Sequence, residues 1–130
     1  MKIVAVEPIG ISAERAQEIK QELANKGHEF VWYADRKEDA ATLVERMKDA
    51  EVVIISNIPL REEVFSQCPK LTFLNVAFTG LDHIDLEYCK AHGILVKNAS
   101  GYATEAVAEL SIGLMIDVLR KITFLDGSIR

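Results

Sequence analysis

Residues 77–80 (Ala-Phe-Thr-Gly) could bind a small anion through their backbone. They follow the apolar run 71–76, which predicts a buried strand, so they lie where that strand ends. Gly80 permits a positive φ, which would let successive N–H groups converge into a nest that suits a carboxylate. Spacing alone favours an ordinary turn glycine, so these residues by themselves do not decide between the two interpretations.

Ser56 and Asn57 stand at a similar place, directly after the continuous apolar run Val52–Ile55. Such a run predicts a strand that is covered on both faces. The two polar side chains could help to wall a ligand site. They could equally satisfy backbone groups in the turn that leaves the strand, and the residues alone leave both roles open.

Asp82, His83 and Asp85 form a small polar cluster that could be taken for a metal site. Two carboxylates this close to the start of a helix, here predicted over residues 86–92, are more often caps. No further His or Cys stands nearby at a ligand spacing. The sequence therefore predicts no metal site, and none of the three histidines is an obvious general base.

Short apolar or β-branched runs alternate with helical segments along the whole chain. The predicted strands cover residues 2–6, 28–33, 52–55, 71–76 and 94–96. The predicted helices run from a cap at Ser12 to about Lys26, then over residues 39–49, 61–67, 86–92 and from an N-cap at Thr104 to about Arg120. This alternation predicts an α/β, flavodoxin-like, doubly wound five-stranded parallel sheet of order 2-1-3-4-5 with a long C-terminal apolar helix.

A sheet of this kind binds ligands outside the carboxyl ends of its strands, near the switch between strands 1 and 3. Four segments should therefore form the rim of a site: residues 7–8, 56–57, 77–80 and 98–104. The polar residues singled out above fall within or beside this rim.

Bulk composition is that of one ordinary globular domain, with 130 residues, 49% hydrophobic and 27% charged. A net charge of −5 without a basic cluster argues against a nucleic-acid partner. Two cysteines are too few for a disulfide framework, so we expect reduced thiols in a cytoplasmic protein. The N-terminus does not suit a signal peptide, and no run approaches a membrane span.

Three motifs, TGLDHID, GILVKN and GYATEAVAEL, follow one another between residues 79 and 110. In this order and spacing they resemble the N-terminal substrate-binding (catalytic) domain of the D-isomer-specific 2-hydroxyacid dehydrogenase family. The resemblance implies an NAD- or NADP-dependent enzyme that transfers a hydride between the nicotinamide and a small 2-oxo or 2-hydroxy acid. The third motif looks closest to the glycerate/hydroxypyruvate reductase and D-lactate branches.

The resemblance also implies roles for individual residues. Backbone N–H groups at Thr79 and Gly80 would bind the substrate carboxylate, and a residue at the Thr79 position also approaches the nicotinamide. The implied substrate-binding residues are Ser56, Asn57, Phe78, Thr79, Gly80 and Tyr102, and the implied cofactor-binding residues are Thr79 and Thr104. The family often has a proline soon after the Asn, where this chain has Ala-Ser-Gly at 99–101, so the loop that carries Tyr102 departs from the pattern.

No G-x-G-x-x-G occurs among the seven glycines, and the family's catalytic Arg, Glu and His lie in later sequence. We therefore expect residues 1–103 to be a substrate-binding domain and residues 104–130 an inter-domain helix that starts the connection to a missing nucleotide-binding domain. The chain alone should bind no NAD or NADP and have no activity. The alternative is a stand-alone flavodoxin-like module that binds a small carboxylate or a partner. A receiver or flavoprotein is disfavoured, because Glu7 and Ser56-Asn57 stand where a receiver needs its acidic cluster and phosphorylated Asp.

The helix predicted from Thr104 is apolar almost all round, with ten apolar residues between 107 and 122. A helix of this kind is buried on most sides. One sheet face cannot cover it, so we expect the chain to form a homo-oligomer through this helix.

Overall fold

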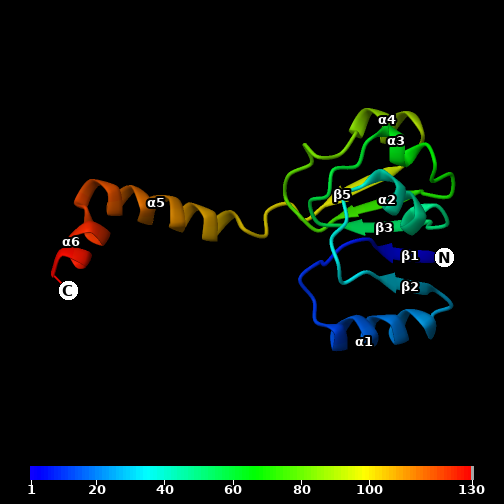
Figure 1. Cartoon of the computed structure of the whole chain (residues 1–130), viewed down its shortest axis with the longest axis horizontal. Coiled ribbons are helices and arrows are strands. Elements are labelled where there is room, and N and C mark those ends of the chain that lie inside the picture. Colours follow the sequence, from blue (N-terminus) through cyan, green and yellow to red (C-terminus); the bar gives the residue numbers. More distant parts are fainter. Residues whose placement is uncertain (130) are drawn as a thin grey trace. The chain divides into compact units, whose positions relative to one another are not determined.

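The computed structural model describes residues 1–129, which fall into two compact units, Met1–Ser100 and a second unit that starts at Gly101. The first unit holds a five-stranded sheet in the order β2-β1-β3-β4-β5 (Figure 1). All four strand pairs are parallel. The predicted fold class and strand order are thus confirmed.

Elements of the first unit alternate as the sequence predicts. They are β1 (Lys2–Ala5), α1 (Ala13–Ala24), β2 (Glu29–Trp32), α2 (Ala40–Met47), β3 (Val52–Ile55), α3 (Glu62–Phe65), β4 (Phe73–Val76), α4 (Leu86–Ala91) and β5 (Leu95–Asn98). Ser12 caps α1 as predicted, because its side chain accepts the backbone N–H of Arg15.

The strands β4 and β5 begin later than predicted, for a local reason. The N–H of Leu71 donates to the carbonyl of Cys68 at 3.1 Å, and that of Ile94 donates to the carbonyl of Cys89 at 2.8 Å. The N–H group of each residue is therefore used in the turn that precedes the strand and not in the sheet. Apolar character alone does not distinguish such a closing residue from the first residue of a strand.

Two helical layers cover the two faces of the sheet. The face that meets α2, α3 and α4 is buried at its centre, where Val4, Val6, Val53, Ile55, Leu74 and Val76 are each at 0% exposure. Strand register puts Ile3, Phe30, Val52, Phe73 and Leu95 together on the opposite face. There α1 packs along β2 (Figure 1), while Leu95 on the edge strand is 54% exposed.

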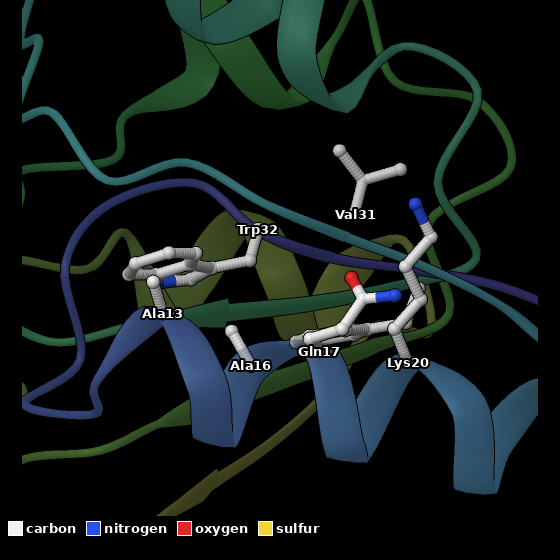
Figure 2. A pocket seen from close by; sticks show the side chains of 7 residues that line it. Ala13, Ala16, Gln17, Lys20, Val31 and Trp32 are labelled. Atoms are coloured by element: carbon white, nitrogen blue, oxygen red, sulfur yellow. The ribbon is translucent and has the colours of Figure 1, made fainter.

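A groove of about 340 Å³ runs between α1 and β2. Figure 2 shows the indole of Trp32 next to Ala13 at one end of it. The indole Nε1 is buried and has no hydrogen-bond partner among the described residues. Every lining residue comes from α1 or β2, so the groove is separate from the turns that follow β3 and β4.

The second unit consists of α5 (Thr104–Arg120) and α6 (Ile122–Ile129), joined at Lys121 in the left-handed conformation. Thr104 was predicted as the N-cap of α5, and this is wrong. Thr104 is the first helical residue, Ala103 holds the cap position, and no side chain bonds the cap. Within the described part of this unit no side chain is buried. In the described chain no helix is both long and apolar enough to cross a membrane.

Candidate active site

Two turns leave the carboxyl edge of the sheet side by side. We call residues 56–58 the β3 turn and residues 77–80 the β4 loop. Ile55 pairs with Val76 in the sheet, and the N–H of Ala77 donates to the carbonyl of Ile55 at 2.7 Å. The next residues along each strand therefore emerge as neighbours, as the predicted rim requires.

Strand β5 holds the backbone of the β4 loop in place. The carbonyl of Phe78 accepts the N–H of Ala99 at 3.1 Å, and the carbonyl of Thr79 accepts Nδ2 of Asn98 at 2.7 Å. In a trans peptide the C=O and the following N–H point in opposite directions, and the described residues contain no cis bond. The N–H groups of Thr79 and Gly80 therefore both point away from β5.

These two N–H groups have no hydrogen-bond partner among the described residues. They come from successive residues and share one direction, which is the arrangement that binds a single anion. The predicted donor pair is therefore present in the fold, and its use by a carboxylate stays a prediction.

The predicted cause of this arrangement is wrong. Gly80 has no positive φ, unlike Gly10, Gly27, Gly93 and Gly101. A Cβ on Gly80 would meet Oδ2 of Asp82 at 3.6 Å and Cε1 of Phe78 at 4.0 Å, which are ordinary contacts. Anchored carbonyls, and not a left-handed glycine, direct the donors.

The two aspartates of the polar cluster after the β4 loop have different roles. Asp85 caps α4 and accepts the N–H of Tyr88 at 3.0 Å. Asp82 was predicted as a second cap, and it caps nothing; its carboxylate lies beside Gly80 instead. No group of three His, Cys, Asp or Glu side chains in the described chain could hold a metal ion.

His83 connects the β4 loop with the segment before α3. Its ring meets the ring of Phe78 edge-on, with centroids 6.4 Å apart, and its carbonyl accepts the N–H of Leu60 at 2.9 Å. The ring Nε2 is buried and has no hydrogen-bond partner among residues 1–129. His83 therefore contacts Phe78 through its ring, and its Nε2 is enclosed by the protein.

The side chain of Glu7 binds the backbone of the β3 turn, a role that its predicted place on the rim does not indicate. Glu7 lies two residues after the end of β1 and is 1% exposed. Its Oε1 accepts three successive backbone N–H groups, those of Ser56 at 2.7 Å, Asn57 at 3.0 Å and Ile58 at 3.1 Å. The turn therefore forms an anion nest that the protein fills with its own carboxylate, so its backbone donors are not open to a ligand.

Arg36, from the segment between β2 and α2, completes this network and was missed in the sequence. Its Nη1 donates to Oε2 of Glu7 at 2.7 Å and to Oδ1 of Asn57 at 2.5 Å. Its Nε donates to Oε1 of Glu38 at 2.7 Å. An acidic residue directly after strand 1 and an arginine after strand 2 were the available signals, because both strands end at the same edge.

Comparison with known proteins decides the family. The model of the family described as D-isomer specific 2-hydroxyacid dehydrogenase, catalytic domain, matches residues 3–118. The chain belongs to this family.

Relatives include both sequences and solved structures of such dehydrogenases. A glycerate dehydrogenase of Methylorubrum extorquens is 35% identical over 105 residues, which cover 81% of this chain and 32% of the relative. A glyoxylate/hydroxypyruvate reductase of Arabidopsis thaliana is 40% identical over 78 residues, 60% of this chain and 24% of the relative. The NAD⁺-bound 3-phosphoglycerate dehydrogenase of Entamoeba histolytica matches with a TM-score of 0.72 and 34% identity, over 90% of this chain and 38% of that one. The matched part of the chain thus spans between 24% and 38% of the length of these relatives.

Two predicted residues of this dehydrogenase domain belong to the second unit. Tyr102 is 69% exposed, and Thr104 opens α5. Their predicted contacts, Tyr102 with the substrate and Thr104 with the cofactor, stay predictions.

The two thiols of the dehydrogenase domain are enclosed by the protein. Cys68 and Cys89 are free and buried. Burial raises the pKa of the Cys68 thiol to about 11. Burial, with the nearby charge of Asp85, raises the pKa of the Cys89 thiol to about 11 as well. Both thiols stay protonated near neutral pH, when only a thiolate would react.

Proposed function

We propose that this chain is the substrate-binding domain of an NAD(P)-dependent D-2-hydroxyacid dehydrogenase. One observation carries the proposal within this family: the N–H groups of Thr79 and Gly80, in the loop at the carboxyl edge of the sheet, are unpaired among the described residues and both point away from β5. They would hold the carboxylate of a small 2-oxo or 2-hydroxy acid. The names of the relatives, a glycerate dehydrogenase and a glyoxylate/hydroxypyruvate reductase, support an acid of two or three carbons.

The role of the chain is to bind and orient the acid. The nicotinamide would exchange the hydride with C2 of that acid. No G-x-G-x-x-G occurs in the 130 residues, so the chain itself offers no loop that fits the pyrophosphate of a dinucleotide. We assign the dinucleotide, and the catalytic Arg, Glu and His, to sequence that this chain does not contain. The chain alone should therefore reduce no 2-oxo acid and bind no NADH, which calorimetric titration measures directly.

An NMR titration tests the carboxylate site. The ¹⁵N-labelled chain is titrated with D-lactate and, as a control of the same size without a charge, with D-lactamide. We expect millimolar binding of lactate, with the largest amide shifts at Thr79 and Gly80, because the chain lacks the charged Arg partner. Shifts centred on Lys97 or His92, or equal shifts with lactamide, would contradict the proposal.

The reading frame after codon 130 separates the proposal from the alternative of a stand-alone carboxylate-binding module. A frame that continues into a strand, a G-x-G-x-x-G loop and a helix would support the enzyme. A stop codon at that place would favour the module, whatever the outcome of the titration.

We also propose that the chain associates with itself through α5. Leu114, Met115, Val118 and Leu119 line one apolar patch of this helix, and each is at least 55% exposed. Contiguous apolar patches of this kind are rare on monomers. Sedimentation velocity should show a dimer or larger species, and Met115→Glu with Leu119→Glu should convert it to a monomer. A monomeric unchanged chain at tens of micromolar would contradict this.

A further inference from the structure

We infer that Arg36 is a specificity-determining positioning residue, which turns the amide of Asn57 so that its NH₂ group faces the substrate. The inference rests on the proposed function and deepens it. An outward NH₂ group is a donor only, so it favours acids that carry a hydrogen-bond acceptor on C3. The substrate class that follows is the 3-hydroxylated 2-oxo and 2-hydroxy acids, in preference to acids with an apolar C3 substituent.

The chemistry of the contact fixes the orientation of the amide. A guanidinium has five N–H donors and no acceptor. The atom of Asn57 that faces Arg36 must therefore be the oxygen, and Oδ1 does accept from Nη1. Because the amide is planar, its Nδ2 must lie on the other branch, turned away from Arg36.

Arg36 is exposed and is held by two carboxylates, one of them buried. Its Nη1 contacts Oε2 of Glu7 at 2.7 Å, and its Nε contacts Oε1 of Glu38 at 2.7 Å. Glu7 is in turn fixed by three backbone N–H groups of the β3 turn. Charge-assisted bonds of this kind are short and about twice as strong as neutral ones. In the described part of the chain, the side chain of Asn57 has only its bond to Arg36, so its amide is the group that adapts.

The free branch of the amide is left for the substrate side. Arg36 and Glu7 come from the β2 and β1 ends of the edge, whereas the β4 loop lies on the other side of Asn57. Nδ2 of Asn57 has no hydrogen-bond partner among residues 1–129. Neighbouring strands are about 4.8 Å apart, a span that a three-carbon acid covers. With its carboxylate on Thr79 and Gly80, such an acid would bring its C3 substituent to Asn57.

A measurement without ligand tests the orientation. In the ¹³C,¹⁵N-labelled chain, the Nδ2 protons of Asn57 should show NOEs to Ala77 or Phe78 and none to the Arg36 side chain. Arg36→Met should move the ¹³Cγ and Nδ2 resonances of Asn57, whereas Glu38→Gln, which alters only the outer partner of Arg36, should leave them in place. NOEs from the Nδ2 protons to Arg36, or Asn57 resonances that do not move in Arg36→Met, would overturn the inference.

A matched pair of acids tests the specificity. D-Glycerate and D-2-hydroxybutyrate differ only in a hydroxyl or a methyl group on C3. We expect the unchanged chain to prefer glycerate about fivefold, the effect of one ordinary hydrogen bond. Arg36→Met should lower the ratio toward one, and Glu38→Gln should keep it. Asn57→Ala, an exposed change that leaves the Glu7–Arg36 pair intact, should also abolish the preference and serves if Arg36→Met folds poorly.

The two proposals fail in different ways in this experiment. Equal affinities for both acids, with shifts at Thr79 and Gly80 present, would overturn the role of Arg36 and leave the carboxylate site standing. Absence of any shift at Thr79 and Gly80 with either acid would overturn the proposed function, and the inference with it.

Discussion

Glu7 accepts the backbone N–H of Ser56 through a hydrogen bond of 2.7 Å that joins residues 49 positions apart. The bond connects the exits of β1 and β3, the two strands between which the order of the sheet reverses. A ligand nest formed by backbone donors would be expected at this point. Here the nest is filled from within, so the open donors lie one strand further on, in the β4 loop.

Removal of the Glu7 charge should destabilise the fold strongly. Glu7→Gln keeps the shape and one oxygen for the β3 turn, but that oxygen is uncharged and the new NH₂ group cannot accept from Arg36. We expect a loss of about 2–4 kcal/mol in the free energy of unfolding, because a buried cluster of charge-assisted bonds is broken. Urea denaturation measures this. Glu38→Gln removes an exposed partner of the same Arg36 and should change little; equal losses in both variants would contradict the argument.

Gly80 should tolerate a side chain. Its φ is not positive, and a Cβ would make only ordinary contacts, so Gly80→Ala should change the stability by less than about 0.5 kcal/mol. Because alanine keeps the backbone N–H, lactate binding should also persist. Gly93 is the matched control, since it follows α4 with a φ of +72°, and Gly93→Ala should cost about 1 kcal/mol. A larger loss at Gly80 than at Gly93 would sink this prediction.

Asp82 should weaken anion binding at the β4 loop. Its carboxylate lies near Gly80, 3.6 Å from the position of a Cβ, and its side chain has no cation paired with it in the described chain. Asp82→Asn should tighten lactate binding about two- to threefold, and added salt should reduce the difference. The NMR titration measures this, and Glu18→Gln on α1 removes an equal charge at a distance. No change with Asp82→Asn, or the same change with Glu18→Gln, would show that the carboxylate does not act on the loop.

The buried thiols should make the fold sensitive to alkaline pH. Burial raises the pKa of Cys68 and of Cys89 from 9.0 to about 11. Between about pH 9 and 11 the unfolded chain loses these protons while the folded chain keeps them, so stability is full below this window and falls as pH rises through it. Urea midpoints at about pH 8 and pH 10 should differ less in Cys68→Ala/Cys89→Ala than in the unchanged chain. An equal difference in both would contradict the assignment.

The layered fold follows from local pattern. The run Val52–Ile55 is continuous and apolar between the polar residues Glu51 and Ser56, and β3 has the same bounds. The exact first residue of a helix is less predictable than its presence, as Thr104 shows. A threonine before an apolar helix resembles a cap, yet the preceding Ala103 takes that place without a side-chain bond.

The site is less predictable because its defining contacts are distant in sequence. Arg36 reaches Glu7 across 29 positions and Asn57 across 21. Strand order indicates which segments meet at the edge, but it does not indicate which carboxylate fills which nest. The direction of the Thr79 and Gly80 donors likewise depends on Asn98, the last residue of β5, and on Ala99, which directly follows it.

The tie between the β4 loop and β5 links ligand affinity to the local stability of an edge strand. β5 pairs with β4 alone among the described strands, and terminal elements of this kind open at lower free-energy cost than the centre of a sheet. Each opening would release the carbonyls of Phe78 and Thr79 and scatter the donors that they direct. Amide exchange in Leu95–Asn98 should therefore slow when an acid is bound, and substitutions that make this strand fray should loosen binding from a distance without touching the ligand.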